Sequence, residues 1–263
     1  MAATDIAKDQ YENITSAYDG IEKLPHSKLT VELVQAGLGD CTGKVILDLG
    51  GGSGLHARSA LSLGASRVDV VDLYPDMLKN CDTHERSAGR EPGMRVRTYQ
   101  GDATQPLTPL KLPGRDGSGL YDIVMVIWTF DHAETLAQLE SMWANTAAYC
   151  APGGKVVSIR IMDPWGRHEE TFKYGVKISD LKSVPGGVSF VYSPQADPPF
   201  SCEATALEVH YDLEQAVAMA KKYGFDGLEK VDASELKIVK GNPAFWQAFL
   251  DYPGFCCVTG TKR

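Results

Sequence analysis

Short apolar runs alternate with helical stretches along the first part of this 263-residue chain. The runs are rich in β-branched residues and end at turns or glycines, which predicts buried strands at residues 44–50, 66–73, 94–102, 121–130 and 153–162. The stretches between them predict helices at 55–63, 76–86 and 134–149. This β-α-β-α order predicts an α/β fold, in which helices cover both faces of a mostly parallel sheet.

The pattern changes after residue 162. Residues 163–210 are rich in proline, glycine and aromatic residues, so we expect a substrate-cap insertion with little regular helix, packed over the carboxyl edge of the sheet. Asp212 and Asn242 then predict the N-caps of two further helices, and the runs at 227–231 and 254–262 predict two late strands. These two strands would complete a seven-stranded sheet.

The residues before the first strand predict a helical segment. They include the stretches "QYENITSAYDGI" and "SKLTVELVQAGL". We therefore expect an N-terminal helical lid over residues 1–43, followed by one main domain over residues 44–263.

Composition and charge narrow the class of partner. The formal net charge is −8 and no basic patch is present, which disfavours nucleic acid. We find no secretory leader, no apolar run of membrane-spanning length, and no zinc or disulfide spacing among the six cysteines. We expect a cytoplasmic protein, a monomer or a homodimer, that acts on a small molecule and has no membrane partner.

The first predicted strand runs into the glycine-rich stretch "VILDLGGGSG", residues 45–54. At the carboxyl end of a parallel strand, glycines let the backbone approach a ligand closely. The stretch can be framed as Gly50-x-Gly52-x-Gly54, but Gly52-x-Gly54-x-x-Ala57 also satisfies a dinucleotide fingerprint. The loop alone therefore leaves two cofactors open, a nicotinamide dinucleotide and S-adenosylmethionine.

Carboxylates at three successive strand ends favour the second cofactor. Asp48 lies inside the first strand end, where it suits an ammonium group and would repel a pyrophosphate. Asp72 ends the second strand and can accept hydrogen bonds from the ribose that both cofactors carry. Asp102 ends the third strand and can accept from an adenine amino group. No serine-tyrosine-lysine arrangement for hydride chemistry is present.

Taken together, "VILDLGGGSG", "VDVVDLYPDML", "YQGDA", "YDIVMVIWTFDHAE" and "APGGKVV" resemble the motifs of class I S-adenosylmethionine-dependent methyltransferases, in the family's order, over residues 45–157. The family usually has a cysteine or another small residue where Gly51 stands, a departure that we expect to be harmless. The C-terminal half, with "FKYGVKI", "DPPFSCEA" and "NPAFWQAFLDYPGFCCVTG", is similar to methyltransferases of the toxoflavin-biosynthesis type, which act on nitrogens of a small heterocycle.

The resemblance implies a Rossmann-like fold and assigns roles to individual residues. Asp48 and the glycine loop would hold the methionyl moiety, Asp72 the ribose and Asp102 the adenine amine. Tyr11 and Tyr18 are seven residues apart and share one face if the segment is helical; we expect a lid with one hydroxyl near the methionyl carboxylate or the acceptor, and the alternative is an amphipathic helix that covers the sheet. The predicted cofactor-binding residues are Tyr11, Tyr18, Asp48, Gly50, Gly51, Gly52, Gly54, Asp72, Leu73, Met77, Asp102, Ala103 and Trp128.

Methyl transfer needs a base only when the acceptor atom carries a proton. His132 follows the fourth strand and is the first candidate, ahead of Asp131 and the lid hydroxyl of Tyr18; the alternative for His132 is a surface histidine that caps the next helix. Trp128 is either core or an aromatic face near the sulfonium. The predicted substrate-binding residues are Trp128, Asp163, Trp165, Phe172, Tyr174 and His210, and we predict no metal site.

These observations predict a methyltransferase of secondary metabolism that uses S-adenosylmethionine to methylate nitrogen or oxygen of a small aromatic or heterocyclic metabolite. Two alternatives stay open. One is an NAD(P)-dependent oxidoreductase that uses the Gly52-x-Gly54-x-x-Ala57 frame. The other is a protein that keeps the methyltransferase fold without transferring a methyl group.

Overall fold

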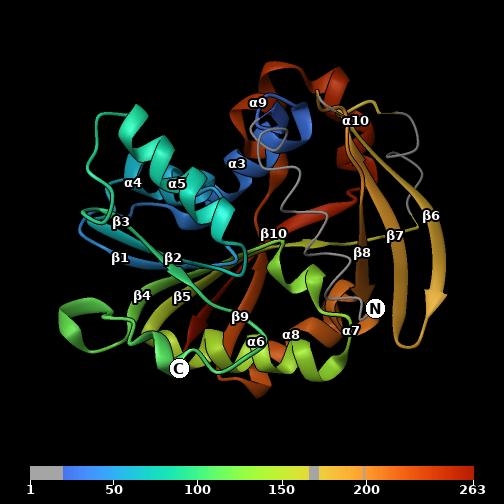
Figure 1. The fold of residues 1–263 in the computed structure, drawn as a ribbon. Helices are drawn as coiled ribbons and strands as arrows, with labels where there is room; N and C mark the ends of the chain where they lie inside the picture. The colour runs from blue at the N-terminus through green and yellow to red at the C-terminus, as the bar shows by residue number, and fades with distance from the viewer. Residues whose placement is uncertain (1–19, 166–171, 198) are drawn as a thin grey trace.

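The computed structural model describes residues 20–165, 172–197 and 199–263. Its central feature is the predicted seven-stranded sheet, and the structure gives its strand order as β3-β2-β1-β4-β5-β10-β9 (Figure 1). The first five strands along the chain are parallel, β10 is antiparallel to β5, and β9 is antiparallel to β10. The strands are β1 (Val45–Leu49), β2 (Arg67–Asp72), β3 (Val96–Gln100), β4 (Tyr121–Ile127), β5 (Cys150–Ile161), β9 (Phe225–Lys230) and β10 (Phe255–Lys262).

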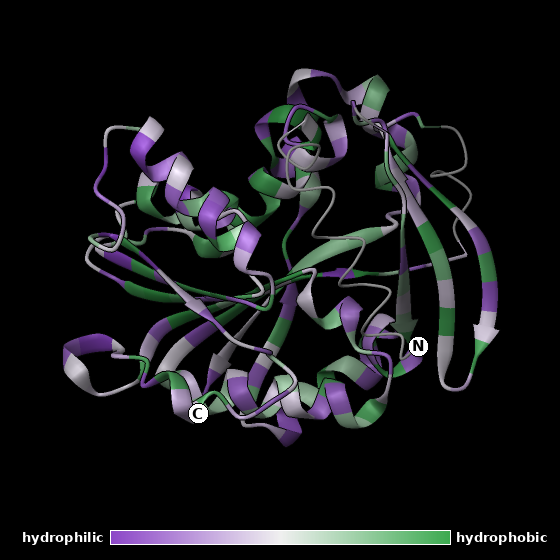
Figure 2. Ribbon diagram, in the orientation of Figure 1, coloured by the Kyte–Doolittle hydropathy of each residue, from purple (hydrophilic) through white to green (hydrophobic). Residues whose placement is uncertain are grey.

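Helices cover both faces of this sheet because successive strand residues point to opposite sides. In β1, Ile46 packs into the core beneath one helical layer and Leu47 into the core beneath the other. The first layer contains α3 (Pro25–Leu38), α4 (Leu55–Ser62) and α5 (Pro75–Ser87); the second contains α6 (Leu136–Tyr149) and α8 (Leu213–Lys222). Figure 2 shows the central strands as predominantly hydrophobic and the helices as two-faced.

Side-chain caps fix the starts of the later helices, as the sequence predicted. Asp212 Oδ1 accepts a hydrogen bond from the backbone N–H of Gln215 at the start of α8, and Asn242 Oδ1 accepts from that of Phe245 at the start of α10 (Pro243–Asp251). Thr135 and Gln138 form a reciprocal capping box at α6. The remaining described helices are α7 (Glu208–Tyr211), α9 (Lys237–Gly241), η1 (Thr108–Leu110), η2 (Arg115–Gly117), η3 (Thr129–His132) and η5 (Ala233–Glu235).

The insertion after β5 contains a second sheet that our sequence analysis did not identify. Strands β6 (Val176–Val184), β7 (Gly187–Pro194) and β8 (Cys202–Leu207) pair antiparallel in the order β6-β7-β8. Val188, Phe190 and Ala206 on this sheet form a small core with Ile161 at the end of β5. Strand β8 also packs against η3, so the second sheet stands at the carboxyl edge of the main sheet (Figure 1).

The predicted lid is described only in part. Helix α3 matches the predicted helical stretch before β1, whereas Tyr11 and Tyr18 lie outside the described residues. The six cysteines are free and buried. Within the described ranges, no helix combines the length and apolar character needed to cross a membrane.

Candidate active site

A cavity of about 890 Å³ lies at the carboxyl ends of the parallel strands. The strand order reverses direction between β1 and β4, and a ligand site is expected at that switch point. One part of the wall, which we call the strand-end half, contains the Gly50–Gly54 loop, Asp72 and Asp102. The facing part, the second-sheet half, is formed by His26, Trp128, Asp131, Phe190, Tyr192 and Phe255.

The glycine loop is held in a conformation that other residues adopt poorly. Gly50, Gly52 and Gly54 have φ values of 70°, 54° and 79°, in the left-handed region. The N–H of Gly50 donates to the carbonyl of Val71 at 2.7 Å, which ties the loop to β2. A Cβ at Gly50 would overlap the side chain of Thr129, which itself donates to the carbonyl of Leu49 at 2.6 Å. The loop is therefore a rigid turn rather than a slack one.

Asp48 supplies a buried carboxylate without a partner. The residue is 1% exposed, and neither oxygen has a hydrogen-bond partner among the described residues. Burial, together with the nearby charge of Asp72, raises the pKa of this carboxyl to about 7. An unsatisfied buried carboxylate is costly, so its presence in the cavity wall indicates a ligand that brings a cation or a hydrogen-bond donor.

Gly51 stands where the family usually has a cysteine or another small residue, and the structure shows what a side chain would contact at this position. A Cβ at this position would lie 2.6 Å from Oδ2 of Asp48 and 2.9 Å from Cγ1 of Val70. Any larger residue would have to displace the carboxylate or the strand behind it. The exchange that we expected to be harmless is therefore coupled to the position of Asp48.

Asp72 and Asp102 both line the cavity, and both are fixed by backbone N–H groups. Asp72 accepts from the N–H of Gly52 at 2.8 Å and of Tyr74 at 2.9 Å; burial raises its pKa while these bonds lower it. Asp102 accepts from the N–H and the hydroxyl of Thr104, at 2.8 and 2.7 Å. Each oxygen can accept more than one bond, so both carboxylates keep the capacity to bind hydroxyl or amino groups of a ligand.

Apolar residues continue the strand-end half between these carboxylates. Leu73 is exposed, Met77 is buried, and both line the cavity. The carbonyl of Ala103 accepts a hydrogen bond of 2.8 Å from Asn145 on α6, which anchors this wall to the second helical layer. Of the described residues of the predicted cofactor set, all except Gly54 line this one cavity; Gly54 is the N-cap of α4 at the base of the loop.

Trp128 stands where β4 ends, in a left-handed conformation with φ of 63°. Its ring stacks on the imidazole of His26 from α3, with centroids 5.5 Å apart, and contacts Phe255 at 5.2 Å. A positive φ at a tryptophan is a strained arrangement of the kind that clusters at functional sites. The indole therefore forms part of the cavity wall and also packs against the core.

The two candidate bases on η3 have different surroundings. Asp131 is buried, and its Oδ1 lies 3.3 Å from Nε2 of His210, with the Arg160 guanidinium further inside the core. His132 is accessible within the cavity, and the surrounding protein lowers its pKa by desolvation, against the opposing effect of Asp131. At neutral pH this histidine is uncharged, which is the form that can accept a proton.

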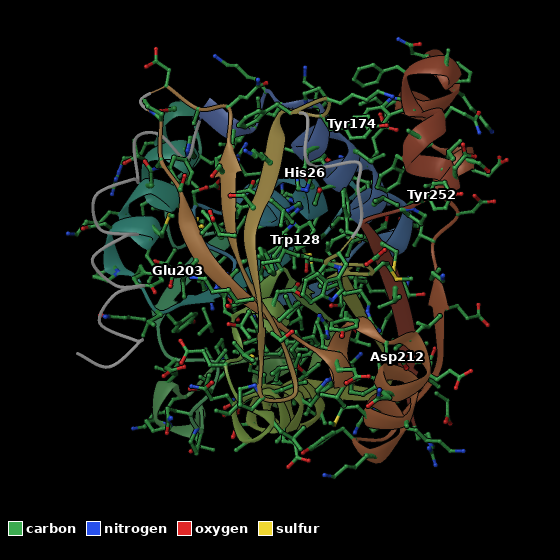
Figure 3. All side chains as sticks on the ribbon, turned by 90° about the vertical axis from the view of Figure 1, so that its right-hand side faces the viewer. His26, Trp128, Tyr174, Glu203, Asp212 and Tyr252 are labelled. Atoms are coloured by element: carbon green, nitrogen blue, oxygen red, sulfur yellow. The ribbon has the colours of Figure 1, made fainter. Side chains whose placement is uncertain are left out.

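The second-sheet half contains aromatic residues that sequence reasoning did not single out. His26, Phe190, Tyr192 and Phe255 line the cavity, with the rings of His26 and Phe255 4.7 Å apart and those of His26 and Tyr192 6.4 Å apart. Viewed from the second sheet, His26 and Trp128 lie behind its strands (Figure 3). Val188, Phe190 and Tyr192 alternate with smaller or more exposed residues, a pattern that could have predicted strand β7. The prolines and glycines around these residues obscured this strand pattern.

Five of the six predicted substrate-binding residues, all within the predicted insertion 163–210, are not part of the cavity lining. Tyr174 is buried and stacks on Trp246 at 4.9 Å, and its hydroxyl donates to the carbonyl of Phe245. Asp163 caps a turn by accepting from the N–H of Trp165, whose side chain is exposed. Phe172 also lies outside the cavity lining, and His210 contacts Asp131 from behind. Among these, His210 lies beside Asp131, and the carbonyl of Tyr174 accepts a hydrogen bond of 2.9 Å from the N–H of His26; both partners are cavity residues.

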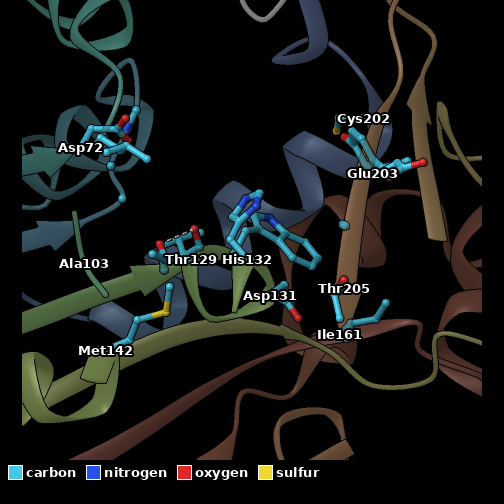
Figure 4. Close-up of a pocket in the computed structure, with 18 of the residues that line it drawn as sticks. Asp72, Ala103, Thr129, Asp131, His132, Met142, Ile161, Cys202, Glu203 and Thr205 are labelled. Carbon is cyan, nitrogen blue, oxygen red and sulfur yellow. Dashed lines mark hydrogen bonds between the residues drawn. The ribbon is translucent and has the colours of Figure 1, made fainter. Parts of the chain in front are cut away.

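Figure 4 shows the two halves of the cavity facing each other, with Asp72 at one side and Cys202 and Glu203 at the other. Thr129 and His132 lie between them. The unpartnered Asp48, the glycine cradle and the carboxylates at the ends of β2 and β3 fit the ammonium, ribose and adenine of S-adenosylmethionine. Among the described residues, no three histidine, cysteine or acidic side chains gather as metal ligands.

Sequence comparison identifies one matching domain family. The methyltransferase domain family matches residues 46–154, which contain the glycine loop, Asp72, Asp102 and η3. Comparison with curated proteins gives no match.

Solved methyltransferases share the fold over nearly the whole chain. A S-adenosylmethionine-dependent methyltransferase from Clostridium acetobutylicum is 14% identical, covers 96% of this chain and 98% of its own, and has a TM-score of 0.63. The CcbJ methyltransferase from Streptomyces caelestis is 17% identical, with 98% of each chain covered and a TM-score of 0.62. CalS10 from Micromonospora echinaspora, an amino pentose methyltransferase solved with its cofactor bound, is 20% identical over 96% of each chain, with a TM-score of 0.52.

These identities establish a shared fold. Together with the domain match, they confirm the predicted class I methyltransferase fold and the resemblance to that family. The closer similarity to the toxoflavin-biosynthesis type stays a prediction.

Proposed function

We propose that this class I S-adenosylmethionine-dependent methyltransferase transfers the methyl group of its cofactor to a nitrogen or oxygen atom of a small aromatic or heterocyclic metabolite. The observation that carries the proposal is the unpartnered carboxylate of Asp48 beneath the glycine loop, in the wall of a cavity of about 890 Å³. This volume is near the upper end of the range for small-molecule sites, about 300–1,000 Å³. The cavity therefore has room for more than one small ligand.

The residues of the strand-end half bind and orient the cofactor in this proposal. Asp48 faces the ammonium group, Asp72 the ribose hydroxyls and Asp102 the adenine amine. S-adenosylmethionine supplies a methyl group already activated by the positive sulfur. The protein consequently contributes mainly by aligning the acceptor atom with that methyl group and by excluding water.

The second-sheet half positions the acceptor. Trp128, Phe190, Tyr192 and Phe255 present aromatic surface on which a flat molecule can lie. His132 is uncharged and accessible in the cavity between the two halves, so it is the group that we assign as proton acceptor, with Asp131 beside it. A base of this kind typically contributes about 10²–10⁴-fold to the rate when the acceptor must lose a proton.

The oxidoreductase alternative finds no specific support. The dinucleotide frame would bring a pyrophosphate to the start of α4, close to the buried carboxylate of Asp48, and like charges in a buried site repel strongly. The matched family and the structural neighbours are methyltransferases.

Cofactor binding is the first test. We expect S-adenosylhomocysteine to release or absorb heat on titration and to raise the melting temperature, whereas NADH and NADPH should do neither. Absence of any heat or thermal shift with S-adenosylhomocysteine would overturn the proposal.

Methyl transfer is the second test. Incubation with methyl-labelled S-adenosylmethionine and a panel of aromatic amines, phenols and heterocycles should yield labelled product with some panel members. Cofactor binding without transfer to any member of a broad panel would favour the alternative of a non-transferring protein with this fold.

A further inference from the structure

The charges that line the cavity are of one sign. Among the described lining residues, seven are acidic and none is lysine or arginine; the acidic ones are Glu22, Asp48, Asp72, Asp102, Asp131, Glu134 and Glu203. One of them, Glu22, forms an ion pair of 3.0 Å with Arg58. A cleft lined by one sign of charge and walled by low-dielectric protein concentrates its electric field on a bound ligand.

The histidines of the lining do not offset these carboxylates. Burial lowers the pKa of His26 to about 4, and that of His56 to about 4 with a contribution from the charge of Arg58. The pKa of His132 is also lowered by desolvation. All three side chains are therefore uncharged at neutral pH, and the described lining is anionic.

The cofactor accounts for only part of this charge. In the proposed function, Asp48, Asp72 and Asp102 serve the cofactor, which carries an ammonium, a sulfonium and one carboxylate. Asp131 on η3 and Glu203 on β8 line the cavity away from the strand-end half; Glu203 pairs with Val191, on the face of the second sheet opposite Phe190 and Tyr192. Asp131 is 6% exposed, and neither oxygen has a hydrogen-bond partner among the described residues, although His210 Nε2 lies 3.3 Å from Oδ1. Arg160 acts on Asp131 electrostatically without forming a salt bridge with it.

Aromatic rings accompany these acidic groups. Trp128, Tyr192 and Phe255 surround His26, with ring centroids 4.7 to 6.4 Å from the imidazole. The faces of such rings attract cations, typically by about 0.5–1 kcal/mol at exposed sites and more when water is excluded. Carboxylates and aromatic faces together recognise an organic cation, whereas an anionic acceptor would meet no basic side chain among the described lining residues.

We infer that the acceptor is an amine carried by an alkyl chain on an aromatic or heteroaromatic ring, that it enters as a cation, and that the enzyme is an N-methyltransferase. This inference deepens the proposed function and rests on it. It excludes acceptors whose reacting end carries a carboxylate or phosphate, and it selects nitrogen over oxygen as the methylated atom.

The bound ammonium R–NH₃⁺ gives one proton to the uncharged imidazole of His132, which frees the nitrogen lone pair. The nitrogen attacks the methyl carbon while the carbon–sulfur bond breaks and its electron pair stays on sulfur. The products are R–NH₂⁺–CH₃, the neutral thioether S-adenosylhomocysteine and a proton that His132 passes to solvent.

A matched charge series tests the inference. Arylalkylamines of several ring sizes, the corresponding alcohols and the corresponding carboxylates are titrated into the protein saturated with S-adenosylhomocysteine. We expect the amines to bind at least about tenfold more tightly than the alcohols and more tightly still than the carboxylates, with the preference falling as salt is raised. Equal or tighter binding of alcohols or carboxylates, or no binding of any amine, overturns the inference.

A variant at Glu203 on β8 tests whether a carboxylate of the lining contributes to amine binding. Glu203→Gln removes one carboxylate of the lining, and we expect it to weaken amine binding a few-fold while leaving alcohol binding unchanged. The matched control is Glu229→Gln, an exposed position on β9 outside the lining, which should change neither. Equal effects of the two variants on amine binding would remove the assigned role of Glu203 and count against an anionic acceptor site.

The series also separates this inference from the proposed function. Failure to bind S-adenosylhomocysteine would overturn the proposed function itself. Normal binding of S-adenosylhomocysteine without a preference for amines would overturn only the choice of acceptor.

Discussion

The strand-end half of the cavity is built from residues close together in the sequence, whereas the second-sheet half is assembled from distant segments. Asp48, Asp72 and Asp102 lie at the carboxyl ends of three strands that succeed one another along the chain. His26 and Phe255, by contrast, meet at 4.7 Å from opposite ends of the chain. Parallel strands bring their carboxyl ends to one edge by construction, so the first half follows from the strand pattern, while the second depends on long-range packing.

The two halves also differ in how their polar groups are satisfied. In the strand-end half, backbone N–H groups hold Asp72 and Asp102, whereas the oxygens of Asp48 have no hydrogen-bond partner among the described residues. In the second-sheet half, aromatic rings contact one another beside Asp131, whose oxygens also have no hydrogen-bond partner among the described residues. A preorganised polar cradle suits a ligand whose functional groups are fixed, and an aromatic wall suits a ligand chosen by shape and charge.

The largest effect on cofactor affinity is expected from a change at the unpartnered carboxylate of Asp48. Asp48→Asn keeps the shape and removes the charge, so we expect affinity for S-adenosylhomocysteine to fall about 30- to 100-fold, or ~2–3 kcal/mol, as for hydrogen bonds to charged groups. Calorimetric titration measures this change. Asp251→Asn, the same exchange at an exposed position on α10, should bind as the wild type does. Wild-type affinity in Asp48→Asn would remove the assigned role of the carboxylate.

The next effect tests the coupling between Gly51 and Asp48. Gly51→Ala places a Cβ 2.6 Å from Oδ2 of Asp48, and overpacking of this kind typically costs about 1–3 kcal/mol. We expect a lower free energy of unfolding in denaturant titrations and roughly tenfold weaker binding of S-adenosylhomocysteine. Gly241→Ala is the matched control, because a Cβ there would meet nothing within 4 Å. Indistinguishable behaviour of the two variants would show that the carboxylate moves aside freely.

A pH series tests the charge of Asp48 in the strand-end half. Because the pKa of Asp48 is raised to about 7, its ionised fraction falls from about 0.8 at pH 7.5 to about 0.1 at pH 6, and we expect roughly eightfold weaker binding of S-adenosylhomocysteine at pH 6. The same raised pKa means that the folded protein binds more protons than the unfolded chain between about pH 4 and 7. This group therefore makes the ligand-free protein less stable as pH rises through that window.

The control for the pH series is Asp48→Asn, in which both dependences should largely disappear. Binding and thermal unfolding measured at matched pH values give the difference between wild type and variant. A pH dependence that persists unchanged in the variant would have to come from another group, with Asp72, whose pKa is also raised, the first to examine.

The smallest effect on binding is expected outside both halves. Tyr174→Phe removes a hydroxyl that donates to the Phe245 carbonyl at 3.3 Å and accepts from the N–H of Phe249 at 3.2 Å. We expect a loss of about 1 kcal/mol in the free energy of unfolding, with unchanged binding of S-adenosylhomocysteine and of acceptors. A raised KM for an acceptor would instead support the substrate-binding role that the sequence predicted for Tyr174.

Sequence periodicity was sufficient for the main sheet, its helices and their caps. It failed in the insertion, where no strands were identified in 163–210 although β6, β7 and β8 lie there. Prolines and glycines at the ends of these strands hid the alternation of Val188, Phe190 and Tyr192. We predicted an acceptor pocket from three aromatic residues of the insertion, Trp165, Phe172 and Tyr174. The type of a residue alone does not show whether its side chain faces a cavity, a core or solvent.

The sequence by itself determined where the strands of the main sheet lie along the chain, the glycine loop, and the three carboxylates of the strand-end half. Each of these features depends on residues a few positions apart. Only the tertiary structure decided that His26 stacks on Trp128, that His210 stands behind Asp131, and that β8 closes the cavity against η3. These contacts join segments far apart in the chain, and their formation depends on how two sheets pack together rather than on any local pattern of residues.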